Sequence, residues 1–249
     1  SVGKTAFVLN IAKNVAVNLN ETVAIFSLEM GAESLVERII CSHASINAGH
    51  LKTGKLTPEE YTQYFVATGA LSEAPIFIDD TPGIRVAEIR AKCRRLKQER
   101  NNLGLVVIDY LQLIEGNGKE SRQQEVSEIS RNLKKLAKEL KVPVIALSQL
   151  SRGVEQRQDK RPIMSDIRES GSIEQDADIV AFLYRDDYYR QEPDENGHVP
   201  EVEPNSTIEV IIEKNRSGPR GTVELNFMKE FNKFTNLVPD GVEQNAPMA

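Results

Sequence analysis

The sequence predicts one α/β domain, in which helices flank a mainly parallel, twisted β-sheet that has an antiparallel extension near its C-terminus. Two observations predict this fold. Apolar runs alternate with amphipathic helical patterns in the first part of the chain, and strand-like runs follow one another directly after residue 178. A length of 249 residues, of which 40% are hydrophobic, suffices for one large domain with a buried core.

Four short apolar runs have the character of strands that are buried on both faces of a parallel sheet. They are Val23–Leu28, Ile76–Ile78, Leu105–Ile108 and Val142–Leu147. Between them, residues 86–96 and 126–140 carry apolar side chains at helical spacing, which indicates amphipathic helices with one face toward a core. This alternation predicts right-handed β–α–β crossovers.

After residue 178 the strand-like runs are separated by short turns that contain glycine or proline, and no helical pattern intervenes. The runs are Ile179–Leu183, Ile208–Ile212, Val223–Phe227 and Phe234–Leu237. We interpret them as an antiparallel extension at one edge of the sheet. The polar segments 115–122, 151–161 and 186–204 are predicted to be surface loops. We expect the domain to cover residues 1–238 and the remainder, 239–249, to be a flexible tail.

Composition limits the classes of function. A formal net charge of −6 excludes a domain that is basic over its whole surface, so any nucleic-acid site must be local. Cys41 and Cys93 stand alone in helix-like segments, which favours a reducing, cytoplasmic location. No apolar run approaches the length of a membrane span, and the three scattered histidines do not form a metal-ligand motif.

The sequence begins with Ser1-Val2-Gly3-Lys4-Thr5, followed by a helical pattern. This is the second half of a P-loop, G-x-x-x-x-G-K-[ST], and we expect the first glycine and the preceding strand to be missing. Gly3 lets backbone N–H groups close around phosphate oxygens, Lys4 reaches the β and γ phosphates, and the Thr5 hydroxyl binds Mg²⁺. The alternative is an ordinary capped helix start.

A second phosphate-site motif is the apolar run Leu105–Ile108, which ends in Asp109. A carboxylate at the carboxyl end of a parallel strand lies at the edge of the sheet where the P-loop is expected. Asp109 is therefore, with Thr5, a candidate to orient Mg²⁺. The alternative is a turn residue at the end of a strand.

Two further strand ends carry candidate catalytic side chains. Glu29 follows Val23–Leu28 and is placed to act as a general base or to orient water, although an acid in the first turn of a helix is also common. Gln149 follows Val142–Leu147, and its amide is able to bond a γ-phosphate or the attacking water. The alternative for Gln149 is a polar strand end that bonds the backbone.

Four segments together resemble the C-terminal motor domain of bacterial replicative DNA helicases of the DnaB type. They are residues 26–30 (FSLEM), 107–114 (VIDYLQLI), 146–152 (ALSQLSR) and 166–178 (DIRESGSIEQDAD). The resemblance covers nearly the whole chain. The family's P-loop begins with further glycine, arginine and proline residues, and a collar domain and a linker helix precede its motor domain. The sequence lacks these features.

The resemblance implies a RecA-like P-loop NTPase fold, assembled as a homohexameric ring around single-stranded DNA with ATP bound between subunits. It also implies that Glu29 is the catalytic carboxylate. Lys214 and Arg216 match the family's lysine and arginine that reach the γ-phosphate of the neighbouring subunit, with Arg216 as the arginine finger. From the sequence alone, both would be solvated turn cations.

The family's DNA contacts fall on Arg168, Glu169 and Gly171 in this sequence, in a loop that lines the central channel and binds the sugar-phosphate backbone. Residues 116–124 are a candidate second channel loop. The basic segment from Arg85 to Arg100 is a less favoured DNA site, because charges opposite an apolar stripe usually form a solvated face. The resemblance also implies a helicase loader and a primase as partners.

The sequence therefore favours an ATP-dependent helicase that translocates 5′ to 3′ on single-stranded DNA. A RecA-like recombinase filament is one alternative, which the match from Ser151 to Gly171 disfavours. A non-catalytic, ATP-gated assembly protein is another. The presence of a full set of candidate catalytic residues, Glu29, Asp109, Gln149 and Arg216, disfavours it.

Overall fold

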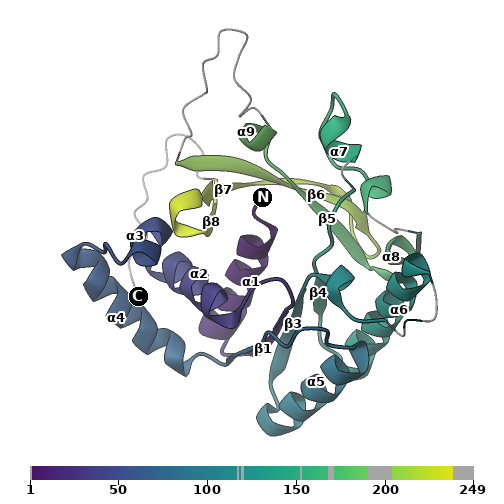
Figure 1. Cartoon of the computed structure of the whole chain (residues 1–249), viewed down its shortest axis with the longest axis horizontal. Coiled ribbons are helices and arrows are strands. Elements are labelled where there is room, and N and C mark those ends of the chain that lie inside the picture. Colours follow the sequence, from purple (N-terminus) through teal and green to yellow (C-terminus); the bar gives the residue numbers. More distant parts are fainter. Residues whose placement is uncertain are drawn as a thin grey trace.

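The computed structural model describes residues 2–116, 118, 121–151, 153–167, 171–189 and 204–237. Ser1, Arg168, Glu169 and the predicted tail lie outside the described residues. Figure 1 shows helices packed around a parallel sheet, with a second, antiparallel sheet lying across one side of the molecule.

The first sheet contains four parallel strands in the order β2-β1-β3-β4. Their bounds are Thr22–Ser27 for β1, Ile76–Asp79 for β2, Leu103–Asp109 for β3 and Val144–Ala146 for β4. All six residues of β1 are buried, and so are six of the seven residues of β3, as expected for strands covered on both faces. The predicted parallel sheet is confirmed.

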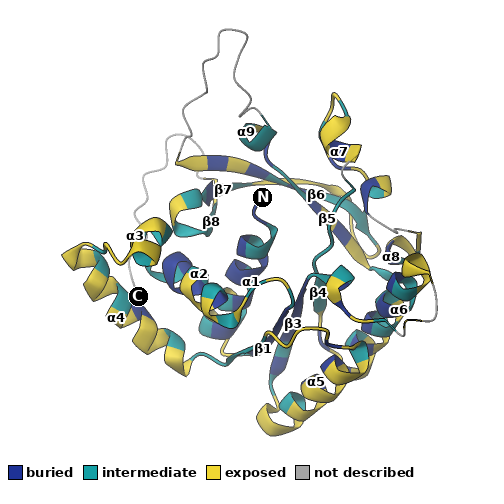
Figure 2. Cartoon of the chain, viewed as in Figure 1, coloured by how far each residue is buried: buried dark blue, intermediate teal, exposed yellow. Residues whose placement is uncertain are grey.

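Helices cover both faces of this sheet, and successive strand residues point alternately into two cores. Val23 and Ile25 pack with α1 and α2, whereas Ala24 and Phe26 pack with α5 and α6. The helix bounds are Lys4–Asn18 for α1, Ala32–Ala44 for α2, Ala48–Thr53 for α3, Pro58–Glu73 for α4, Val86–Arg100 for α5 and Arg122–Leu140 for α6. Figure 2 shows that the buried faces of α1, α5 and α6 turn toward the sheet.

The C-terminal strands form an antiparallel sheet in the order β5-β6-β7-β8. Their bounds are Ile179–Tyr184 for β5, Asn205–Asn215 for β6, Gly221–Met228 for β7 and Lys233–Asn236 for β8. Among the described residues these strands do not continue the hydrogen-bond ladder of β4, so the expected extension at the sheet edge is a sheet of its own. The reason is packing: Ile208 and Phe227 of the second sheet cover Ala6 of α1, while Val180 and Phe182 join the core beside α6.

Short helical segments occupy the connections. These are α7 (Gly153–Gln156), α8 (Gly171–Asp176), α9 (Asp186–Tyr189) and the 3₁₀ turns Leu111–Leu113, Met164–Asp166 and Lys229–Phe231. The segment 151–161, predicted to be a loop, therefore contains one helical turn.

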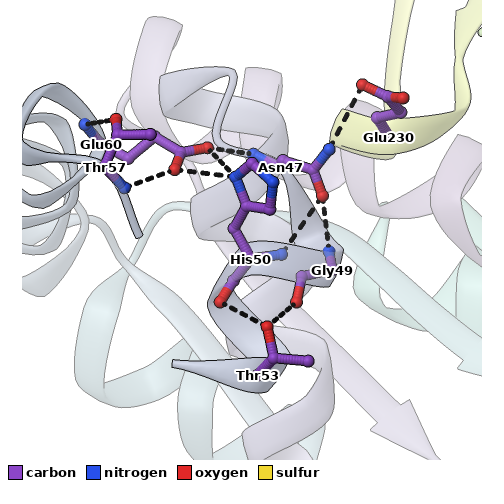
Figure 3. A network of polar contacts seen from close by, with 7 residues as sticks. All are labelled: Asn47, Gly49, His50, Thr53, Thr57, Glu60 and Glu230. Carbon is purple, nitrogen blue, oxygen red and sulfur yellow. Dashed lines mark hydrogen bonds and ion pairs between the residues drawn. The ribbon is translucent and has the colours of Figure 1, made fainter. Parts of the chain in front are cut away.

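A polar network fixes α3 against the start of α4 (Figure 3). The Glu60 carboxylate accepts hydrogen bonds from the backbone N–H groups of Thr57 (2.9 Å) and Asn47 (3.2 Å), and it pairs with His50 Nδ1 at 2.9 Å. The hydrogen bond from Thr57, with those from His50 and Asn47, holds the pKa of Glu60 below its usual range. Asn47 Nδ2 donates to Glu230 at 3.3 Å, so the network also ties α3 to the turn between β7 and β8.

None of the helices in the described part of the chain is both long and apolar enough to cross a membrane.

Candidate functional site

The P-loop residues lie at the start of α1. Gly3 has φ +95°, a left-handed conformation that glycine adopts without strain, and it immediately precedes the helix. The N–H groups in the first turn of a helix have no partner within the helix, and the helix dipole favours an anion there. Because α1 is a full helix of 15 residues, this end of it suits phosphate binding.

Thr5 and Asp109 meet although they come from different elements. The Thr5 hydroxyl donates a hydrogen bond of 2.7 Å to Asp109 Oδ2, at the carboxyl end of β3. Asp109 is 4% exposed, and burial raises the pKa of its carboxyl group. A hydroxyl and a carboxylate held side by side at the N-terminus of α1 form a donor set of the kind that Mg²⁺ takes. The residues present therefore fit a magnesium–nucleotide complex.

Lys4 reaches across the sheet edge toward the end of β4. Its Nζ donates to the backbone carbonyl of Ser148 at 2.9 Å. Burial lowers the pKa of Lys4, while the carboxylates of Asp109 and Glu29 act in the opposite direction. The ammonium group therefore lies among the predicted strand-end residues. A phosphate bound there would compete with the Ser148 carbonyl for the ammonium group.

Glu29 lies two residues beyond β1, in a turn whose residues before and after Glu29 are fixed by hydrogen bonds. Leu28 N donates to the Asp109 carbonyl at 2.7 Å, and Ser27 Oγ donates to the Met30 carbonyl at 2.6 Å. Glu29 itself is exposed, and its charge acts on both Lys4 and Asp109. The turn thus presents a solvent-accessible carboxylate at the same edge as the P-loop.

The backbone of Gln149 is anchored through Gln112, which sequence reasoning did not single out. Gln112 Nε2 donates to Ser148 Oγ at 2.8 Å, and Gln112 Oε1 accepts from Gln149 N at 3.3 Å. Gln112 stands in the VIDYLQLI motif, which was a signal in the sequence that it had a role. A second residue missed is Arg38 of α2, whose charge opposes the rise in the pKa of Asp109. Nothing in its local sequence pointed to it.

We expect Asp109→Asn to stabilise the nucleotide-free protein. Because burial raises the pKa of Asp109, the folded protein holds this proton more tightly than the unfolded chain does. The free energy of unfolding should therefore fall as pH rises from the unfolded pKa, about 3.9, through the higher folded value, and asparagine removes this loss. Calorimetry at pH 7 should show a Tm raised by about 2–4 °C for each kcal/mol gained.

A matched control is Asp178→Asn. Hydrogen bonding from Lys134 lowers the pKa of Asp178, so this carboxylate stabilises the fold when ionised, and the control should lower the Tm or leave it unchanged. A Tm for Asp109→Asn below that of the unmodified protein would contradict the assignment of Asp109 as a buried charge that costs stability.

Lys214 and Arg216 lie at the end of β6, away from the P-loop. Arg216 N donates to the Asp178 carbonyl at 2.9 Å, its Nη1 is 3.4 Å from Asp178 Oδ1, and its side chain is 54% exposed. Lys214 Nζ donates to the Glu174 carbonyl. Figure 1 shows the β6–β7 turn beside α8, apart from the start of α1. The structure does not bring these cations together with Lys4 and Asp109 within one chain.

The candidate DNA residues are described in part. Gly171 is exposed and begins α8, whereas Arg168 and Glu169 lie outside the described residues. In the candidate second loop, Gly118 N donates to Glu125 at 3.0 Å and Arg122 pairs with Glu125 at 2.8 Å, so the described part of this loop is tied to the start of α6.

The cations of α5 and of its N-cap, Arg85, have interaction partners within the chain. Arg90 and Arg94 pair with Glu139, and Lys92 pairs with Asp79. The remaining partners are Glu115 for Arg85, Glu99 for Arg95, the Leu140 carbonyl for Lys97 and the Phe77 ring for Arg100. This pairing favours the interpretation of α5 as a solvated outer face.

Together, the parallel sheet, the P-loop helix and the acidic end of β3 define a P-loop nucleotide-binding domain of the RecA-like class. The sequence profile of the DnaB-like helicase C terminal domain matches residues 1–236. The chain belongs to this family.

Two curated relatives are closely similar. The replicative DNA helicase DnaB of Geobacillus stearothermophilus is 68% identical over 239 residues, which are 95% of this chain and 50% of the relative. The replicative DNA helicase DnaC of Bacillus subtilis (strain 168) is 67% identical over the same extent. The chain thus spans about half the length of these relatives.

A solved structure of a DnaB-like replicative helicase, reported with its interactions with primase, is also similar. It matches with a TM-score of 0.87 and 48% sequence identity, over 96% of this chain and 55% of that chain. The similarity extends over both sheets, because it covers nearly all of the chain.

Proposed function

We propose that this chain is the ATP-hydrolysing motor of a replicative DNA helicase, working as a homohexamer that moves 5′ to 3′ along single-stranded DNA. The observation that carries the proposal is the convergence of Lys4, Thr5 and Asp109 at one sheet edge, with Glu29 and Ser148 beside them. Membership of the helicase family supports DNA unwinding as the work that this site drives.

Each side chain of the site has a separate task. Lys4 and the first N–H groups of α1 bind the phosphates, while Thr5 and Asp109 hold Mg²⁺. Magnesium-bound ATP supplies the phosphoanhydride bond that is cleaved. Glu29 orients the attacking water and accepts its proton on a carboxylate oxygen. Gln149 detects the γ-phosphate at the adjoining strand end.

The exposure of Arg216 supports an assembly in which a neighbouring subunit completes the site. A guanidinium 54% exposed at the end of β6 is available to another copy of the chain, and Lys214 lies two residues before it. An arginine supplied in trans makes hydrolysis depend on ring closure, because the transition-state charge lacks its partner in a monomer.

We propose that Arg168, Glu169 and Gly171 hold the DNA backbone. Arg168→Ala should weaken binding of single-stranded DNA equally for all base sequences, because a phosphate contact carries no base information. The slope of log affinity against log salt should become shallower by about 1. Fluorescence anisotropy with several labelled oligonucleotides over a range of salt concentrations checks both effects.

A suitable control for this test is Arg95→Ala, which removes an exposed cation of α5 that pairs with Glu99. The control should leave both affinity and salt dependence unchanged. A loss of affinity restricted to particular base sequences in Arg168→Ala would contradict recognition of the backbone.

Two other functions use the same nucleotide site: a recombinase filament and a non-catalytic assembly protein. The recombinase can be distinguished by electron microscopy of a protein as long as the full-length relatives. Closed six-membered rings would support the helicase, and open filaments would support the recombinase. Steady ATP turnover stimulated by single-stranded DNA separates the second, because an assembly protein would not show it.

The proposal extends to location and partners. Cys41 and Cys93 are free and buried, which agrees with a cytoplasmic location. The solved relative that was studied with primase supports a primase partner for the longer protein, and a helicase loader is proposed from the family resemblance.

A further inference from the structure

After β4 the chain leaves the first sheet and forms a closed loop before it reaches α8. We call this loop the excursion; it begins at Leu150 and ends at Ile167. The base of the excursion is pinned where it starts and ends: Ser151 N donates to the Asp166 carbonyl at 2.7 Å, and Leu150 and Ile167 form an antiparallel bridge. Gln149 directly precedes this base, and Arg168 directly follows it in the sequence. The two ends of the excursion are therefore the nucleotide-sensing residue and the first residue of the candidate DNA segment.

A partly buried ion pair closes the excursion above its base. Arg157 donates two hydrogen bonds to the Asp166 carboxylate, of 2.8 Å to Oδ1 and 2.7 Å to Oδ2. The side chain of Asp166 is 8% exposed, and its Oδ2 also accepts from Ile163 N at 2.8 Å. Arg157 further donates to the Arg161 carbonyl at 2.6 Å. Bidentate, charge-assisted pairs of this kind fix orientation as well as adding binding energy.

The surroundings of this pair argue against a role in the stability of the whole domain. Figure 1 shows α7, which belongs to the excursion, projecting from the body of the molecule. Of residues 153–161, Val154 alone is buried, and most of the others are exposed (Figure 2). Ile167 of the base packs in the core beside α6 and keeps that packing without Arg157. Loss of Arg157 would therefore loosen the exposed part of the excursion and its hold on the base, rather than open this core.

We infer that Arg157 and Asp166 are positioning residues that couple the nucleotide edge to the DNA-binding segment. The inference rests on the proposed function. With the pair in place, the Leu150–Ile167 bridge moves as one unit, so a displacement of Gln149 is passed to the residues that follow Ile167. Without the pair, the two ends of the excursion move independently, and nucleotide binding no longer sets the affinity for DNA.

The test measures this coupling as a ratio of affinities. The protein used is as long as the full-length relatives. Its affinity for labelled oligo-dT is measured by fluorescence anisotropy, once with a non-hydrolysable ATP analogue and once with ADP. Arg157→Gln should reduce the ratio of the two affinities by about fivefold or more, the usual scale of coupling between sites. ATP turnover without DNA should stay close to the unmodified rate, because Arg157 contacts Asp166 and the Arg161 carbonyl and not the residues of the nucleotide site.

Two variants make the result specific. Arg157→Lys keeps the charge but loses the second hydrogen bond, so its ratio should lie between those of Arg157→Gln and the unmodified protein. Arg161→Gln removes a cation of the same excursion that pairs with Glu209, outside the Arg157–Asp166 pair, and should leave the ratio unchanged. Amide hydrogen exchange at Ser151 should become faster in both Arg157 variants and stay slow in Arg161→Gln.

An unchanged ratio in Arg157→Gln with faster exchange at Ser151 would overturn the inference, since the base would be loose without consequence for coupling. Equal losses of Tm, basal turnover and DNA affinity in both Arg157 variants would overturn it in favour of a purely structural role. An unmodified protein without ATP turnover or DNA binding would instead contradict the proposed function, and the inference with it.

Discussion

Lys4→Ala is expected to abolish nucleotide-dependent unwinding. The Lys4 ammonium is partly buried at the edge of the first sheet and interacts electrostatically with Asp109 and Glu29, so its loss leaves the phosphates without their main positive partner. Removal of one electrostatic donor of this kind costs about 10²–10³ in turnover. The measurement is ATP-dependent strand separation of a forked DNA, together with nucleotide affinity.

The fold should survive this substitution, because burial lowers the pKa of Lys4 and the charged group is costly to bury when no nucleotide is bound. Lys138→Ala, on the exposed face of α6, provides a control that should unwind normally. Unwinding by Lys4→Ala at the rate of this control would remove Lys4 from the phosphate site.

Arg216→Ala is expected to retain nucleotide binding and to lose DNA-stimulated hydrolysis by a factor of about 10³–10⁵, the contribution of an arginine finger. The effect is confined to hydrolysis because the guanidinium is 54% exposed and contacts Asp178 and the Gln175 carbonyl of its own chain, at the end of β6. Turnover with saturating single-stranded DNA, measured beside nucleotide affinity, separates the two quantities. Arg220→Ala, in the same exposed turn, should behave like the unmodified protein.

Mixed assemblies decide whether Arg216 acts in trans. A mixture of Lys4→Ala and Arg216→Ala subunits contains interfaces in which an intact P-loop faces an intact Arg216. Such mixtures should regain part of the turnover that each variant lacks alone. If the mixture remains inactive while unmodified subunits assemble and turn over ATP under the same conditions, or if Arg216→Ala alone hydrolyses ATP at the unmodified rate, the trans assignment is wrong.

Local patterns were sufficient for much of the fold. The buried strands β1 and β3, the amphipathic helices α5 and α6 and the helix that follows Gly3-Lys4-Thr5 were all predicted, because each depends on the periodicity or motif of one continuous segment. Candidate site residues at strand ends could also be predicted from the sequence, since the carboxyl ends of parallel strands meet at one edge of a sheet. Arg38 could not be predicted as a site residue, because the sequence around a cation on a helix surface does not indicate which carboxylate it faces.

The sequence by itself determined the class of fold, the family and the residue types of the nucleotide site, because motifs and apolar periodicity are properties of neighbouring residues. Only the tertiary structure decided which distant groups meet. Thr5 and Asp109 are 104 residues apart in the chain, and Lys4 and Ser148 are 144 apart. Tertiary packing also decided that the C-terminal strands form a separate sheet and that Arg157 closes on Asp166. These pairings follow from strand order and from the packing of whole elements, which no single segment encodes.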